Sequence, residues 1–480
     1  MFINYSMLLA ILPQILLVIL GGIVLILELV LSKDQYRNIG WVTAIGMAFI
    51  LLLSIPTIPK ESGELTWGGM IKHDWIGYIF TVMVVFGAGI SALFAMDFKS
   101  LGKQGGFFVL IISATLGMSF MASAADLVLL FVAIETSSLS LYILASLFTN
   151  EDESAEAGFK YFLFGALTST IMLYGFSLLY GFSGSTNIYR IAESFRAGGI
   201  PLAAIIGSLL LVLVGFTFKI SGVPFHFWAP DVYQGAPTPV SGFLSTASKA
   251  AGFVVLARVL AAVFQDISLY WGAIIAAIAV ASMTIGNLLA LTQKNIKRML
   301  AYSSIAHAGY ALIGLVTISR IGLSSMVLYL IVYLVTNLAA FGIVSAYGRI
   351  VGSDELSAYY GMSRRSPWLA LALLVALLSL AGMPPLGGFI AKVFVFAAAV
   401  DANMVWLAVV GVLNAIIGLY YYLTVLKYVY LYRSEDEDKP LPVTRPIMVA
   451  LIFLSVGIIL LGTLLAPWFD WATTAAASVY

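Results

Sequence analysis

Ionisable side chains stand inside long apolar stretches of this sequence. Glu135, Lys219, Lys249 and Lys392 fall in the middle of such stretches, and Lys160 lies just inside the start of another. A charge at the centre of a lipid bilayer costs a few kcal/mol even on lenient insertion scales, so such residues usually face a protein interior and mark an ion or proton path. We therefore expect these five residues to handle protons or ions.

The depth of each charge separates a functional position from an interfacial one. Glu135 lies about ten residues, or roughly 15 Å, from the nearer end of its stretch, and its short stem cannot reach water from there. Lys219 follows a long apolar segment and directly precedes a proline-containing break. This position favours a side chain that faces a cavity over one that snorkels to the membrane interface. Lys249 is also near the middle of its stretch. Lys392 lies nearer to an end, so snorkelling is a stronger alternative there, although function is still favoured.

Two histidines are weaker candidates. His307 could be a proton relay or a satisfied core histidine, and the residue type alone leaves these two readings equal. His226 follows Pro224 in the first break and is a slightly stronger candidate. We include both histidines in the predicted site.

Other polar residues have structural explanations. Glu156 and Lys160 stand four residues apart and are expected to pair at the start of their helix. Asp126 is expected to cap a helix N-terminus. Arg258 lies near the end of an apolar stretch and is expected at the membrane interface. The tyrosines at 420–422 are expected to be ordinary packing or part of an aromatic belt.

The elements that carry these residues are predicted to be transmembrane helices. The chain has 480 residues, of which 61% are hydrophobic and 10% charged, and its mean hydropathy is +1.03. Soluble domains are about 25% charged, and a helix needs about 20 apolar residues to cross the bilayer. We predict an all-α polytopic membrane protein with about 14 spans. These spans are 8–32, 39–56, 76–96, 106–122, 125–148, 157–183, 200–231, 237–263, 269–292, 299–318, 322–348, 367–400, 403–432 and 446–468.

Loop charges predict the orientation. Of the 24 lysines and arginines, fifteen fall on one set of alternate loops, five on the other and four within spans. Because basic loops stay in the cytoplasm, both termini are expected on the non-cytoplasmic side. The first apolar run is longer than a signal-peptide core and no Lys or Arg precedes it, so we expect it to be retained.

Composition excludes several chemistries. Without cysteine there is no thiolate-bound cluster and no disulfide. The three histidines are scattered without metal-ligand spacing, and no phosphate-binding or dinucleotide-binding glycine motif is present. We therefore expect no cofactor or metal in this chain, and any uphill transport must draw its energy from a gradient or a partner.

Two predicted spans are interrupted by proline. The breaks fall at 219–226, around Pro224, and at 381–388, around Pro384 and Pro385. Broken helices at membrane depth are tolerated where they are buried in protein or line a polar cavity. The breaks are five spans apart, and this odd offset predicts inverted repeats. We predict an N-terminal three-helix segment at 1–105, repeats at 106–265 and 266–432, and a C-terminal loop and last span at 433–480.

Four segments resemble a known family. They read FHFWAPDVYQGAPTPV at 225–240, STASKAAGF at 245–253, NIKRMLAYSSIAHAG at 295–309 and LAGMPPLGGF at 380–389. The first two resemble the span seven to eight signature of subunit N of proton-pumping NADH:quinone oxidoreductase, respiratory complex I. The third resembles a segment shared with Mrp-type cation/proton antiporters, and the fourth resembles the second broken helix of the family. The resemblance covers nearly the entire chain.

The resemblance implies a role for five residues. Glu135 corresponds to the glutamate of span five, and Lys219 to the lysine of span seven that pairs with it. Lys249 corresponds to the connecting lysine, and His307 to a histidine of the central polar axis. Lys392 corresponds to the lysine of span twelve near the exit. Subunit M usually has glutamate at the span-twelve site, and subunit L has a long C-terminal extension with a lateral helix, so subunit N fits better. The presence of the first three spans indicates a bacterial, archaeal or plastid-type chain.

The resemblance also implies a setting. We expect a translocase subunit without a redox centre, in a bacterial-type inner (cytoplasmic) membrane. Its expected partners are an antiporter-like neighbour, small membrane subunits and the lipid bilayer, with no nucleic acid. Flavin, iron–sulfur clusters and quinone are expected in partner subunits.

Two other functions remain open from the sequence. One is a Mrp-type or hydrogenase-linked cation/proton antiporter subunit, from which the aromatic stretch at 225–233 distinguishes this chain only moderately. The other is a stand-alone permease for an organic solute. A permease is disfavoured because the charged residues follow the bundle midplane through several spans instead of clustering around one site.

Overall fold

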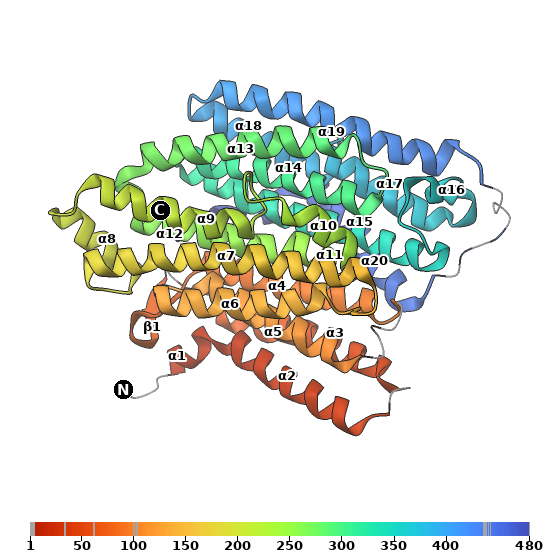
Figure 1. The fold of residues 1–480 in the computed structure, drawn as a ribbon, viewed down its shortest axis with the longest axis horizontal. Coiled ribbons are helices and arrows are strands. Elements are labelled where there is room, and N and C mark those ends of the chain that lie inside the picture. The colour runs from red at the N-terminus through yellow and green to blue at the C-terminus, as the bar shows by residue number, and fades with distance from the viewer. Residues whose placement is uncertain are drawn as a thin grey trace.

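The helices of this chain form one bundle. The computed structural model describes residues 5–32, 35–60, 63–98, 101, 104–434, 439, 441 and 443–479. The N-terminal segment comprises α1 (Tyr5–Ala10), α2 (Leu12–Val30), α3 (Arg37–Leu53), the paired antiparallel strands β1 (Glu64–Thr66) and β2 (Ile71–His73), and α4 (Trp75–Ala95). Figure 1 shows most of the long helices lying side by side.

The helices continue without further strands through the described part of the chain. The first half contains α5 (Gly105–Ser123), α6 (Leu127–Ala145), α7 (Asp152–Ser183), α8 (Ile188–Ala197), α9 (Leu202–Lys219), α10 (Trp228–Gly235), α11 (Thr238–Phe243) and α12 (Lys249–Val263). The second half contains α13 (Ser268–Ala290), α14 (Ile296–Val316), α15 (Arg320–Val351), α16 (Met362–Arg365), α17 (Pro367–Ala381), α18 (Gly387–Asp401), α19 (Val405–Leu431), α20 (Arg445–Thr463) and α21 (Leu465–Ala477).

The predicted all-α membrane class is confirmed. Among the described residues, 12 helices are long and apolar enough to cross a membrane, and α3 and α17 are shorter apolar helices. Each of the fourteen predicted ranges overlaps one of these helices. The number of crossings and the inverted repeats stay predictions.

Both predicted breaks are confirmed. Helix α9 ends at Lys219 and α10 begins at Trp228, whereas α17 ends at Ala381 and α18 begins at Gly387. Gly382 ends α17 with φ +88°, a left-handed conformation that glycine adopts without strain. Proline follows in each break and cannot continue the helix, because it has no N–H and clashes with the preceding turn.

Two interruptions were not expected. The span predicted at 237–263 contains a π-helical turn, Leu244–Ser248, directly before Lys249. The last predicted span is split between α20 and α21, because Pro467 in the first turn of α21 cannot donate a bond to the end of α20.

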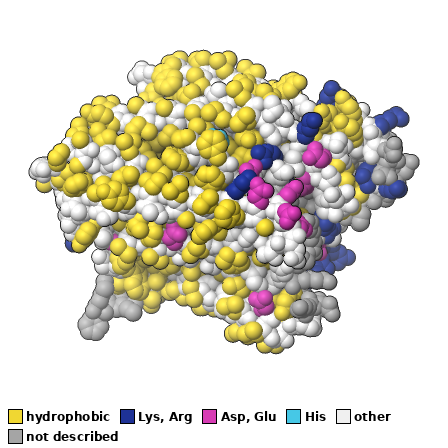
Figure 2. All heavy atoms as spheres, in the orientation of Figure 1, with side chains coloured by type: hydrophobic (Ala, Val, Ile, Leu, Met, Phe, Trp, Pro, Cys, Tyr) yellow, Lys and Arg dark blue, Asp and Glu magenta, His cyan; other side chains and the backbone are white. Residues whose placement is uncertain are grey.

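The middle of the bundle is formed by α11–α12, α14 and α15, which are almost entirely buried. Both ends of the chain meet the β1–β2 hairpin region: Trp67 Nε1 donates to Met7 O, and Lys72 Nζ donates to Ser478 O. Figure 2 shows many of the acidic and basic side chains of this face gathered on its right half, over the end at which α10 and α16 lie in Figure 1. We call this end the charged end of the bundle.

Candidate functional site

Lys219 lies buried at the end of α9 and faces α6. Its Nζ donates to Ser138 Oγ at 3.0 Å and approaches Ser137 Oγ at 3.4 Å. Glu135 lies one helical turn before Ser138, partly buried, and its Oε1 has no hydrogen-bond partner. Although the structure describes both Glu135 and Lys219, it shows no direct ion pair between them. The contact implied by the family resemblance is therefore replaced by hydrogen bonds to serine hydroxyls.

The stem of Lys219 packs against α12. A methyl group added at Gly252 would lie 3.2 Å from Lys219 Cγ, so the absent side chain makes room for the lysine. Gly252 is one turn after Lys249 on the same helix, so the stem of Lys219 packs on α12 one turn away from Lys249. Beside Lys219 is a small cavity of about 10 Å³, whose wall includes the side chains of Ser138 and Ser169. This volume is near the minimum for one water molecule.

Lys249 joins the two halves of the chain. It is buried at the start of α12, and its Nζ donates to the carbonyl and the hydroxyl of Ser304 at 2.8 and 2.5 Å. Ser304 belongs to α14, in the second half. His307 follows one turn later on α14, so Lys249 and His307 are linked through one helical turn.

Tyrosines hold both ring nitrogens of His307. Nδ1 is 2.6 Å from Tyr329 Oη, and Nε2 is 3.1 Å from Tyr422 Oη. Tyr422 in turn forms a short hydrogen bond with Ser303. A neutral imidazole has one donor and one acceptor nitrogen, and each tyrosine hydroxyl can fill either role. The histidine is therefore a fully bonded, buried group with partners on two other helices.

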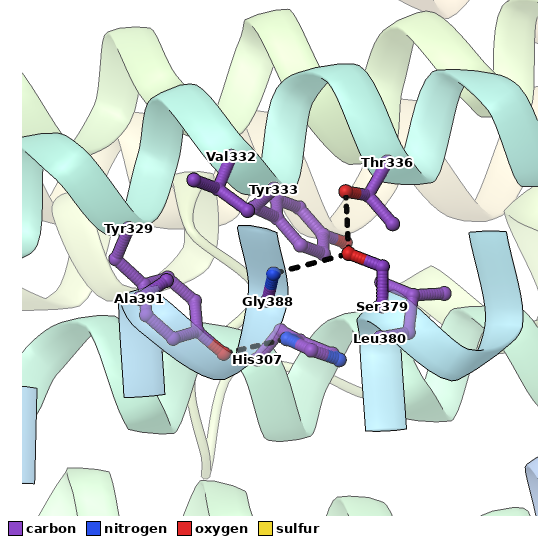
Figure 3. Close-up of a pocket in the computed structure, with 9 residues that line it drawn as sticks. All are labelled: His307, Tyr329, Val332, Tyr333, Thr336, Ser379, Leu380, Gly388 and Ala391. Atoms are coloured by element: carbon purple, nitrogen blue, oxygen red, sulfur yellow. Dashed lines mark hydrogen bonds between the residues drawn. The ribbon is translucent and has the colours of Figure 1, made fainter. Parts of the chain in front are cut away.

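A small cavity separates His307 from the second break. Its volume is about 10 Å³, and Figure 3 shows His307, Tyr329 and Ser379 around it. Ser379 Oγ accepts a hydrogen bond from Gly388 N and lies 3.2 Å from Thr336 Oγ1. The cavity has polar groups on its wall and space near the minimum for one water molecule, so it can bridge the histidine to the break.

Lys392 lies beyond this cavity, on α18. It is 6% exposed, and its Nζ donates to Leu380 O and Ala381 O, both at 2.9 Å. These carbonyls end α17, where the helix dipole attracts a cation. The Nζ also stands 5.1 Å from the centroid of the Tyr310 ring. The snorkelling alternative for Lys392 is therefore wrong, because the ammonium turns inward to the broken helix.

The remaining two candidates form no hydrogen bond with the five residues above among the described residues. His226 is buried in the first break, with its ring tilted 32° from that of Phe227, and its Nδ1 has no hydrogen-bond partner. Lys160 lies at the charged end and pairs with Glu156 at 2.5 Å, as predicted, and with Asp231 at 2.6 Å. The structure thus brings together five of the seven predicted residues and leaves Lys160 in an ion-pair cluster.

Several polar contacts of the bundle differ from those predicted or were not predicted. Arg258 is 3% exposed and donates to both carboxylate oxygens of Asp74, at 2.7 and 2.8 Å, a pair that was not predicted. The expectation of simple packing is wrong for Tyr422, which bonds to His307. The capping role of Asp126 is confirmed, because its Oδ1 accepts from Val128 N and Leu129 N.

This arrangement can pass protons but offers no metal site. Serine and tyrosine hydroxyls both donate and accept hydrogen bonds, and a lysine accepts a proton only when it is neutral. Such groups alternate from Glu135 to Lys392, with a water-sized cavity beside Lys219 and another beside His307. Among the described residues there is no group of three or more His, Cys, Asp or Glu that could hold a metal ion.

An all-α bundle with two broken helices and a buried row of lysines and histidine defines an antiporter-like membrane subunit. Residues 124–418 match the family described as "NADH:quinone oxidoreductase/Mrp antiporter, TM". NADH-quinone oxidoreductase subunit N of Moorella thermoacetica is 39% identical, with 97% of this chain and 98% of the relative covered. The corresponding subunit of Heliobacterium modesticaldum is 40% identical, with 94% of each covered. The chain belongs to the NADH-quinone oxidoreductase subunit N family.

Solved structures agree with this membership. A chain of respiratory complex I from Thermus thermophilus is 34% identical and has a TM-score of 0.80, with 95% of this chain and 98% of that chain covered. A chain of the Mrp complex from Dietzia sp. has a TM-score of 0.87 but 23% identity, with 100% and 98% covered, and shows the shared fold alone. The Mrp alternative is not favoured, because the similar curated relatives above are named subunit N.

Proposed function

We propose that this chain translocates protons as subunit N of an NADH:quinone oxidoreductase, and that the row of buried ionisable residues carries them. The single observation that supports this best is the burial of polar contacts along the row. Lys219 donates to Ser138, one turn after Glu135, Lys249 donates to Ser304, one turn before His307, and a water-sized cavity lies between His307 and the second break. The row comprises Glu135, Lys219, Lys249, His307 and Lys392.

The position of Lys219 suggests how a proton is released. At about 4 Å and an effective dielectric of about 20, an ion pair with Glu135 gains about 4 kcal/mol. Lys219 donates to serine hydroxyls instead, and we interpret this arrangement as the open state of the pair. Moving one proton against about 200 mV costs about 4 to 5 kcal/mol. Closing and opening this pair therefore involves an energy of the size needed to move one proton.

The pathway then runs from the first half to the second. A proton that leaves Lys219 passes to Lys249, crosses to α14 through Ser304 and His307, and reaches Lys392 at the second break. His226, next to the first break, and Lys160, at the charged end, are accessory candidates in this scheme. The halves correspond to the repeats at 106–265 and 266–432, with 1–105 and 433–480 as flanking segments.

The energy is expected from partner subunits. Redox chemistry at flavin, iron–sulfur clusters and quinone in those subunits would drive this chain, in which we assign no redox centre. The partners are an antiporter-like neighbour and small membrane subunits. We place the chain in a bacterial-type inner (cytoplasmic) membrane, with the charged end in the cytoplasm and both termini outside.

Purification of the native complex tests this function. We expect an affinity-tagged chain to co-purify with the other membrane subunits and with subunits that oxidise NADH, and to acidify inverted vesicles upon NADH addition. Lys249→Ala should leave the complex assembled but reduce the proton uptake strongly. A chain that purifies alone and exchanges an organic solute would support the permease alternative and contradict the proposal.

A further inference from the structure

Helix α10 is a short segment whose position must be fixed by its neighbours. It has eight residues, Trp228–Gly235, between the first break and the turn at Pro237. Isolated helices shorter than about 12 residues are marginal in water. The contacts at its two ends therefore decide where α10 lies.

An ionic cluster at the charged end holds α10 to both halves of the chain. Asp231 accepts a hydrogen bond from Lys160 Nζ at 2.6 Å and, through its other oxygen, from Arg298 Nη1 at 2.5 Å. Lys160 belongs to α7 and Arg298 to α14. Arg298 also donates to Gln234 Oε1 at 3.2 Å, one turn further along α10. One carboxylate thus connects three helices, and we call Lys160, Asp231 and Arg298 the α10 clamp.

A second contact strengthens the same attachment. Lys297, next to Arg298, is buried and its Nζ donates to the backbone carbonyls of Gln234 and Ala236, at 2.5 and 2.8 Å. These carbonyls lie at the end of α10, where a cation satisfies groups that have no partner within the helix. The end of α10 is therefore bonded directly to α14.

The opposite end of α10 reaches the Lys219 site through stacked rings. Trp228 stacks on Tyr161, with ring centroids 4.3 Å apart and planes 10° from parallel. Tyr161 makes an edge contact with Tyr142, with centroids 4.7 Å apart. Tyr142 is one turn after Ser138 on α6, and Ser138 accepts the hydrogen bond of Lys219. Tyr161 directly follows Lys160 on α7, so one turn of α7 carries both the clamp and the stack.

We propose that Asp231 is a positioning residue for proton transfer: through Lys160 and Arg298 it fixes α10, and the Trp228–Tyr161–Tyr142 stack passes that position to Ser138 and Lys219. This inference rests on the proposed function of Lys219. Proton transfer depends on sub-ångström geometry, so a small shift of α10 changes the rate without unfolding the site.

The exposure of the clamp distinguishes it from a structural anchor. The side chains of Lys160, Asp231 and Arg298 are 33, 29 and 31% exposed. Ion pairs that water reaches contribute little to stability and are weakened by salt. We therefore expect the clamp to affect the coupling of transport more than assembly, and to respond to the ionic strength on the charged side.

The test uses the whole complex in inverted vesicles. Asp231→Asn removes the charge from both pairs and keeps the shape of the side chain. We expect the amount of assembled complex, measured by NADH oxidation with a soluble acceptor, to stay near the wild-type level. We expect the number of protons taken up per NADH oxidised, with quinone as the acceptor, to fall at least threefold. Asp231→Glu should restore most of this ratio. Raising the salt concentration should lower the ratio in the wild type but have little effect on Asp231→Asn.

Matched variants make the outcome decisive. Asp266→Asn removes the exposed Arg196–Asp266 pair, which lies away from α10, and should change nothing. Lys160→Gln removes one arm of the clamp and should give a smaller loss than Asp231→Asn. A normal proton ratio in Asp231→Asn, while Lys219→Ala is impaired, would overturn the clamp and leave the proposed function intact. Loss of assembled complex in both Asp231→Asn and Lys160→Gln would also overturn it, because the cluster would then be a folding element.

Discussion

Substitution of Lys392 separates two roles that the structure assigns to one ammonium group. Lys392 Nζ donates to Leu380 O and Ala381 O, both at 2.9 Å, and so caps the end of α17. As the last member of the proposed row, it must also take up and release a proton. Lys392→Met removes every donor, whereas Lys392→Gln keeps two N–H donors but carries no charge and cannot cycle a proton.

The energies of the two variants differ. Leaving a buried carbonyl unsatisfied costs about 1–3 kcal/mol, so Lys392→Met loses about 2–6 kcal/mol at the two carbonyls. Removal of a buried ammonium offsets part of this loss. Lys392→Gln exchanges charge-assisted bonds of about 1.5–3 kcal/mol for neutral bonds of about 0.5–1.5 kcal/mol, and its shorter side chain weakens them further. We expect a larger drop in the apparent unfolding temperature of the complex for Lys392→Met than for Lys392→Gln.

Proton uptake by inverted vesicles, normalised to assembled complex, is the deciding assay. Both variants should lose most of their proton uptake, although their stabilities differ. If Lys392→Gln pumps like the wild type, Lys392 is only a cap for α17. The proposed row would then have to end at another residue.

Two further substitutions test the packing around the site and the fold. Gly382→Ala places a methyl group 2.9 Å from Lys392 Cδ at φ +88°, so it should lower proton uptake. The control Gly352→Ala, at φ +75° with nothing within 4 Å, carries the same backbone cost of about 1–2 kcal/mol and should pump normally. Equal losses of proton uptake in both variants would mean that only backbone strain matters. Arg258→Ala leaves Asp74 buried without its bidentate partner and should destabilise the chain by about 3–5 kcal/mol, seen as loss of assembled complex in membranes. Normal assembly of Arg258→Ala would show that water replaces the arginine.

The sequence was informative where one residue type is rare in its setting. Lysine and glutamate stand out in an apolar stretch, and proline interrupts a helix wherever it falls, so Lys219, Lys249 and both breaks could be located without the structure. The residues that complete the site are common types. Ser138 and Ser304 gain their roles only from lysines that are 81 and 55 residues away in the chain.

Charge pairing across helices could not be read from the sequence. Arg258 was expected at the interface because it stands near the end of an apolar stretch, and its partner Asp74, 184 residues away, was not predicted. Asp231 lay within a recognised motif, yet its bridge between α7 and α14 depends on how three helices meet. The contact expected between Glu135 and Lys219 is not formed, because Lys219 donates to Ser137 and Ser138 instead. A sequence does not specify which of several nearby polar groups a buried lysine contacts.

Lys219→Arg tests the central claim, that a buried lysine in this chain takes up and releases a proton. Arginine keeps the positive charge and can still donate to Ser138, but it does not give up its proton in proteins. Vesicles should be compared for proton uptake per assembled complex in the wild type, Lys219→Ala and Lys219→Arg. The proton-cycling account predicts that both variants assemble and that both lose most of their uptake. Full uptake in Lys219→Arg would contradict it, because a fixed charge at this position would then be sufficient.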